Sequence, residues 1–342
     1  MNFSQDRVRG WKAWLAGAVC AVLSMALQAA APFELREGDR VLFLGDTFFE
    51  REVDYGHLET RITAAFPDRN VTFRNLSWAA DSPMGRSRAS FDWNKSEADW
   101  LKRVEEQVGL VKPTVAFLSY GMTAALELAA LPSGEQSAFV SKFTGDLGKL
   151  MDAVDRVSGQ TVRYVILGPT PAGDFTGRDP QEAGRLQTAL KAIEQGLEGL
   201  AASRGARYQG LSKWPPDSFD ARGQRSTVDG VTLTESSYQF LAGFLNQELF
   251  PPVRGGTGAQ LDLLNAAIRK KNELFFHRWR PANWTYLFGF RKHEQGQNAG
   301  EIPKFEPLIV EWERRIAGLR TLNAPDAAAV AEVRQILADE AT

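Results

Sequence analysis

Four polar side chains, two carboxylates and two hydroxyls, are candidates for chemistry in this chain. Asp46 and Thr47 follow the apolar run Val41 to Leu44, and far along the chain Asp229 is followed three residues later by Thr232. A hydroxyl attacks a carbonyl only when a base takes its proton, and histidine is the usual base. The chain has three histidines, none of which is within this pattern. They are His57, His277 and His293.

The elements that must position these residues alternate between short apolar runs and helical patterns. Five short runs read as strands buried on both faces, because they are nearly continuous in apolar residues. They are 41–44, 71–73, 115–118, 162–167 and, more weakly, 206–208. The helical patterns lie at 56–66, 98–111, 138–157, 180–203 and 235–249. This alternation predicts an α/β fold, a flavodoxin-like three-layer α/β/α sandwich with a parallel sheet.

Ligands of such sheets bind at the carboxyl ends of the strands, so the loops there should hold the chemistry. We expect these loops at 45–47, 75–81, 120–124 and 226–234.

The first of these loops carries a family resemblance. The run Gly38-Asp39-Arg40-Val41-Leu42-Phe43-Leu44-Gly45-Asp46-Thr47 resembles the first block of SGNH/GDSL hydrolases, an esterase and lipase family. The resemblance implies that Thr47 stands at the position of the nucleophilic serine. It also implies that Asp46 stabilises the loop by accepting backbone amides.

The other three family blocks also have counterparts, each with a substitution. The run Asn75 to Asp81 resembles the second block and places Ala80 at the glycine whose amide binds the oxyanion. Tyr120 to Ala124 resembles the third and places Thr123 at the oxyanion-binding asparagine. Asp229-Gly230-Val231-Thr232 resembles the fourth, with the aspartate kept and Thr232 at the histidine position. Threonine cannot take a proton at neutral pH, so the resemblance does not establish an esterase.

The C-terminal part, residues 253–342, reads as a helical and aromatic extension packed on the SGNH-like domain of residues 32–252. Its segments 272–281 and 286–294 are similar to an extension of SGNH-type proteins encoded by planctomycetes and their relatives. One hypothesis is that it folds over the strand ends, so that His277 or His293 replaces the missing base. The other is that both histidines pack in an aromatic cluster.

The aromatic and basic residues of this C-terminal part could form a glycan surface, but a scaffold lid is the favoured interpretation. They are Arg278, Trp279, Arg280, Asn283, Trp284, Tyr286 and Arg291.

Composition and the N-terminus indicate where the protein works. A net charge of -2 and 24% charged residues argue against a nucleic-acid partner. Arg7, Arg9 and Lys12 precede an apolar run, 13–27, that ends in small residues, which predicts a signal peptide at 1–31 and a secreted or periplasmic protein. The one cysteine, Cys20, lies in this leader. We expect no membrane association after cleavage, and no metal or cofactor, because no ligand spacing or phosphate loop is present.

Two functions remain open on these grounds. The favoured one is a catalytically impaired SGNH-like protein that binds a glycan or another small acylated ligand. The alternative is an active ester hydrolase, of the carbohydrate esterase or deacetylase type, that uses Thr47 and a relocated histidine.

Overall fold

The computed structural model describes residues 31–173, 179–212 and 226–340, and from Glu34 on they belong to one compact unit. The predicted signal peptide, with Cys20, lies outside the described residues apart from Ala31. None of the described helices is long and apolar enough to cross a membrane.

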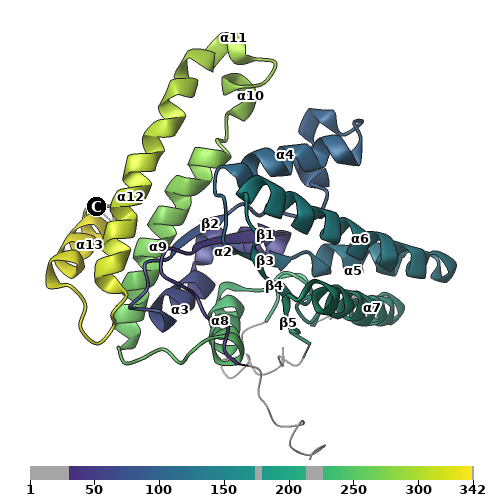
Figure 1. The fold of residues 1–342 in the computed structure, drawn as a ribbon, viewed down its shortest axis with the longest axis horizontal. Helices are drawn as coiled ribbons and strands as arrows, with labels where there is room; N and C mark the ends of the chain where they lie inside the picture. Colours follow the sequence, from purple (N-terminus) through teal and green to yellow (C-terminus); the bar gives the residue numbers. More distant parts are fainter. Residues whose placement is uncertain (1–30, 174–178, 213–225, 341–342) are drawn as a thin grey trace, which may run out of the picture. The chain divides into compact units, whose positions relative to one another are not determined.

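Five parallel strands form one sheet in the order β2-β1-β3-β4-β5 (Figure 1). The strands are β1 Arg40–Gly45, β2 Thr72–Asn75, β3 Val115–Ser119, β4 Arg163–Leu167 and β5 Arg207–Gln209. Val41 pairs with Phe73 on one side and with Val115 on the other, so β1 lies inside the sheet and β2 at its edge. The predicted α/β fold with a parallel sheet is confirmed, and all five predicted strands are present.

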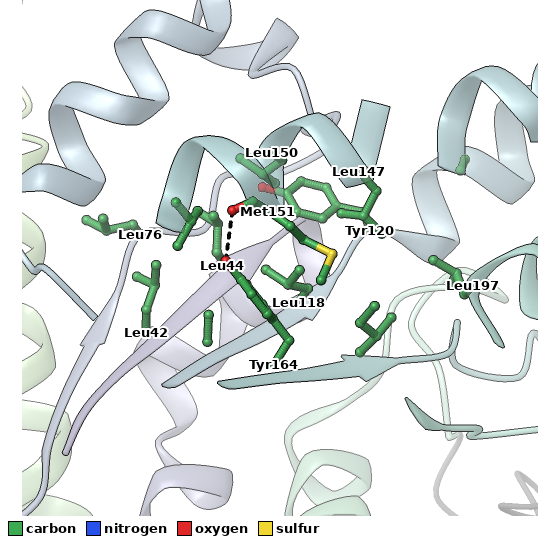
Figure 2. Close-up of a cluster of buried hydrophobic side chains, with 14 of the residues drawn as sticks. Leu42, Leu44, Leu76, Leu118, Tyr120, Leu147, Leu150, Met151, Tyr164 and Leu197 are labelled. Atoms are coloured by element: carbon green, nitrogen blue, oxygen red, sulfur yellow. Dashed lines mark hydrogen bonds between the residues drawn. The ribbon is translucent and has the colours of Figure 1, made fainter. Parts of the chain in front are cut away.

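One face of the sheet packs against four helices. Leu42, Leu44 and Leu118 belong to a single buried cluster with apolar side chains of these helices (Figure 2). The helices are α4 Glu97–Gly109, α5 Gly121–Ala130, α6 Ser133–Ser158 and α7 Pro180–Arg204. Within the cluster the Tyr164 hydroxyl donates a hydrogen bond of 2.9 Å to the carbonyl of Met151, which satisfies a buried polar group.

The opposite face is rich in aromatic rings. Phe43 of β1 stacks on Phe49 at 4.9 Å and meets Phe117 of β3 edge-on at 5.5 Å. The helices of this layer are α2 Thr47–Tyr55, α3 His57–Ala65 and α8 Glu235–Leu249. Tyr238 of α8 stacks on Phe48 and donates to its carbonyl at 2.8 Å, so α8 is fixed to the helix that begins at Thr47.

The C-terminal part is helical and covers the edge strand. Its long helices α9 Gly258–Trp279 and α12 Phe305–Leu319 run side by side, and Figure 1 shows α10 and α11 at the far end of this pair. The remaining elements are α10 Trp284–Leu287, α11 Lys292–Gln295, the 3-10 helix η4 Gly296–Lys304 and α13 Ala327–Glu340. Lys271 of α9 is buried, donates to the β2 carbonyl of Phe73 at 3.3 Å and pairs with Glu59 at 2.5 Å. The edge of the sheet is therefore capped by a side chain from this part of the chain.

Two of the expected loops were wrong in detail, and two further segments had no assigned structure. Thr47 and Gly121 begin helices α2 and α5, where loops were expected, because helices of nine and ten residues are too short to show clear periodicity. The stretch 277–305, which has no clear periodicity in the sequence, contains α10, α11 and η4. The tail beyond residue 319 forms α13, which packs on α12 and α9.

Candidate functional site

The candidate site lies where β1 and β3 end and two helices begin. Asp46 follows β1, and its backbone N–H donates to the carbonyl of Ser119, the last residue of β3, at 2.8 Å. Thr47 is the first residue of α2, and Thr123 lies in the first turn of α5. The parallel register of β1 and β3 thus places two of the four family blocks side by side.

Asp46 joins the two helix N-termini. Its carboxylate accepts the N–H of Phe48 at 3.3 Å and that of Thr123 at 3.0 Å. Burial raises the pKa of Asp46 to about 6, although these hydrogen bonds lower it. The first turn of α5 is therefore tied to the start of α2 through the Asp46 carboxylate.

Thr47 meets the second block directly. Its hydroxyl oxygen accepts the backbone N–H of Ala80 at 3.0 Å, and it has no other hydrogen-bonding partner among the described residues. Ala80 has φ 53°, in the left-handed region that favours glycine. The Ser87 hydroxyl holds this conformation by donating to the carbonyl of Ala80 at 2.7 Å. The backbone N–H that the resemblance assigns to oxyanion binding therefore points to the Thr47 hydroxyl. It belongs to a residue whose Cβ makes this φ strained.

A buried ion pair anchors the Ala80 loop. Arg88 donates from Nε to the Asp81 carboxylate at 2.6 Å and from Nη1 to Gln107 of α4 at 2.6 Å, and both side chains of the Asp81–Arg88 pair are 0% exposed. Burial raises the pKa of Asp81, and the charge of Arg88 opposes this. Sequence reasoning missed Arg88, since no motif singles it out from other arginines.

The fourth block forms a closed turn. Asp229 Oδ1 accepts the N–H of Thr232 at 2.7 Å, and Oδ2 accepts its hydroxyl at 3.0 Å. Gly230, at φ 93°, allows the chain to reverse between them. In this turn Thr232 uses its hydroxyl as a donor to Asp229, and a threonine offers no imidazole for the carboxylate to orient.

Each histidine has other neighbours than Thr47 among the described residues, and His277 lines one pocket together with Glu50 of α2. The ring of His277, in the last turn of α9, contacts Phe276 and Phe305 with centroids 5.7 and 6.2 Å apart. His293 in α11 has a side chain that is 74% exposed and lies 3.7 Å from the carboxylate of Glu294. His57 begins α3 and faces Glu235 at 3.8 Å. Within the described residues, no imidazole forms a hydrogen bond with the Thr47 hydroxyl.

The C-terminal part contributes a guanidinium group, that of Arg280, near the site. The Arg280 side chain lies over the ring of Trp78 at 3.4 Å and faces Glu50 of α2 at 3.6 Å. Trp78 is two residues before Ala80, and Glu50 is one helical turn after Thr47, so Arg280 contacts both of the segments that carry the Thr47–Ala80 hydrogen bond. Trp279 packs edge-on against Trp78 at 6.0 Å.

The other members of the suggested glycan surface lie apart from this site or face a different neighbour. Trp284, 41% exposed, is in α10 at the far end of the α9–α12 pair. Arg291 donates to the Tyr286 hydroxyl at 2.5 Å and pairs with Glu294, and Arg278 faces Glu306 at 3.8 Å. Sequence reasoning identified Arg280 only as one of seven candidates for a glycan surface, and no local sequence signal separates it from Arg278.

Similar solved structures are esterases and related enzymes. A protein described as a GDSL-like lipase from Parabacteroides merdae ATCC 43184 is 12% identical, with a TM-score of 0.45 over 64% of this chain and 98% of its own. A catalytic mutant of the acetylxylan esterase Axe2 from Geobacillus stearothermophilus is 15% identical, with a TM-score of 0.45 over 65% and 100%. A gut microbial diltiazem-metabolizing enzyme is 10% identical, with a TM-score of 0.49 over 90% and 97%.

Identities and TM-scores this low say nothing about activity. The assignment of the fold depends on the strand order and on the Thr47–Ala80 contact. The chain has an SGNH/GDSL hydrolase-like fold. No family model and no curated protein matches the sequence.

Proposed function

We propose that this protein is an exported SGNH/GDSL hydrolase-like protein with impaired ester hydrolysis, whose site at the strand ends binds a glycan or an acylated ligand. One observation supports this most. The Thr47 hydroxyl, at the nucleophile position of the resemblance, has the Ala80 amide as its partner and no hydrogen bond to an imidazole among the described residues.

The expected loss of rate is large. Removing the base of a serine-type triad costs on the order of a millionfold in kcat. Losing one oxyanion donor costs roughly a hundred- to a thousandfold more, and Thr123 stands where the resemblance places an asparagine donor. The alternative, a relocated histidine, is not favoured by the positions of His277 and His293.

The site is rich in donors and poor in free acceptors, which supports ligand binding. Arg280 Nη1 and Trp279 Nε1 are buried donors with no hydrogen-bond partner in the part of the chain that the structure describes. Asp46 and Asp81 are already engaged by amides and by Arg88. Buried donors need acceptors, and the oxygens of an acyl group or of a sugar supply them.

An esterase assay on residues 32–342 tests the loss of hydrolysis. With p-nitrophenyl acetate and p-nitrophenyl octanoate we expect the rate without protein, unchanged by Thr47→Ala. Hydrolysis that Thr47→Ala abolishes would refute the proposal. Activity that emerges only in the double variant Thr47→Ser, Thr232→His would show that these substitutions account for its absence.

Ligand binding is tested with Arg280→Gln and the matched control Arg278→Gln. The two arginine side chains are both 26% exposed, and each faces one glutamate at 3.6 to 3.8 Å. Calorimetry with acetylated and unmodified xylo-oligosaccharides should show binding that Arg280→Gln weakens about tenfold or more, since a charged hydrogen bond contributes roughly 1.5–3 kcal/mol. Equal effects of the two variants would remove Arg280 from the site.

A further inference from the structure

A separate cavity of about 280 Å³ lies at the edge strand β2, between α3 and α12. None of Thr47, Ala80 and Thr123 lines it. Its walls are largely apolar. The apolar lining residues are Leu35, Ile62, Phe66, Val71, Phe73, Val310, Ile316 and Ala317. Val310 is 54% exposed, so the apolar wall continues to the surface.

The charges around this cavity do not balance. Six charged residues line it: Glu59, Arg69, Lys271, Glu313, Arg314 and Arg320. Glu59 pairs with Lys271 at 2.5 Å, and Glu313 pairs with Arg74 at 2.5 Å. Both lining carboxylates are therefore neutralised.

The arginines are neutralised only in part. Arg314 pairs with Glu311 and Glu332, each at 2.7 Å. The guanidinium groups of Arg69 and Arg320 have neither an ion pair nor a hydrogen bond within the described residues. An apolar cavity thus carries two uncompensated positive charges, and Arg69 is exposed.

We propose that this cavity binds an alkyl carboxylate, such as a medium-chain fatty acid, with the chain among the apolar walls and the carboxylate on Arg69 and Arg320. A guanidinium matches a carboxylate with two parallel hydrogen bonds. Ligand cavities usually measure roughly 300–1,000 Å³, so this one suits a small ligand. A carboxylate offsets one of the two positive charges and can bond to both guanidinium groups, whereas a neutral or cationic head group offsets none.

The test is calorimetry on residues 32–342 at low ionic strength with hexanoate, octanoate, decanoate, 1-octanol and octylamine. Each methylene added between hexanoate and octanoate should raise affinity about fourfold, the equivalent of the free energy of burying one CH₂. Octanoate should bind more tightly than octanol, and octylamine most weakly. The double variant Arg69→Gln, Arg320→Gln should lower octanoate affinity to that of octanol and leave octanol unchanged.

The matched control is Arg254→Gln with Arg334→Gln, which removes two exposed arginines outside the cavity and should change nothing. Ala317→Phe should fill the cavity and weaken octanoate and octanol alike. Equal affinity for octanoate and octanol in the wild type, no dependence on chain length, or an unaffected double arginine variant would each overturn the proposal. Thr47→Ala should not alter this binding, so the result is independent of the proposed function.

Discussion

Glu52 gives the clearest test of how the scaffold under Thr47 is held. Its side chain is 2% exposed, and Oε1 accepts the N–H groups of Leu58 and Glu59 at 2.5 and 3.3 Å, which caps α3 with a side chain of α2. Oε2 is buried without a hydrogen-bond partner among the described residues. Burial raises the pKa of Glu52 from 4.5 to about 8, so the carboxyl is largely protonated at neutral pH.

The sign of the pH dependence follows from this shift. The folded protein binds the Glu52 proton more tightly than the unfolded chain, so stability is full below pH 4.5 and falls as the pH rises through about 8. The shift of about 3.5 pH units corresponds to about 5 kcal/mol over the whole window, and about 4 kcal/mol of it falls between pH 5 and pH 9. Glu52→Gln has the shape of the protonated side chain and does not titrate.

Urea unfolding of the wild type and Glu52→Gln at one-unit steps from pH 5 to pH 9 measures this difference. The variant should match the wild type within about 1 kcal/mol at pH 5 and exceed it by about 4 kcal/mol at pH 9. Asp46 is present in both proteins, so its contribution to the pH dependence of stability cancels in the comparison. Glu135→Gln, an exposed glutamate in α6, is the control and should stay within about 0.5 kcal/mol of the wild type at every pH. Parallel curves for the wild type and Glu52→Gln would refute the reasoning.

Three further substitutions test the site. Ala80→Gly should raise the free energy of unfolding by about 0.5–1 kcal/mol in thermal denaturation, because φ 53° suits glycine, whereas Ala79→Gly should lower it. Arg88→Met should cost about 3–5 kcal/mol in urea unfolding, because it leaves its carboxylate partner buried without a countercharge. Ser87→Ala should cost about 1 kcal/mol by the same measurement, because the Ala80 carbonyl loses its hydrogen bond; no change would mean that the Ser87 hydroxyl does not hold the Ala80 conformation.

The sheet was predictable because its strands are buried on both faces. A run such as 115–118 is apolar at every position, and each of its residues is at most 1% exposed. The helix that starts at Thr47 was not visible, because Asp46 caps it immediately after the strand and leaves no loop residues between them. Periodicity needs more than two turns before it separates a short helix from a turn.

The contact between Thr47 and Ala80 could be anticipated, because both follow strands that end at the same edge of the sheet. The position of Arg280, in the C-terminal part, could not be anticipated from the sequence. Arg280 reaches Trp78 because α9 runs past β2 and ends beside the Ala80 loop, and that path depends on packing between segments far apart in the sequence. Arg88 was missed for a similar reason, since only burial distinguishes its pairing with Asp81 from a surface arginine.

The side chain that the C-terminal part places beside Thr47 decides how the site should be understood. An imidazole there would accept the hydroxyl proton and restore a hydrolase, but a guanidinium only donates, and it gives up its proton only at strongly alkaline pH. Burial lowers the pKa of Arg280, and the carboxylate of Glu50 opposes this, so its charge is retained. Under the proposed function, this positive charge stabilises oxygen atoms of the ligand without giving Thr47 the means to attack it. The same geometry that supports binding therefore argues against turnover.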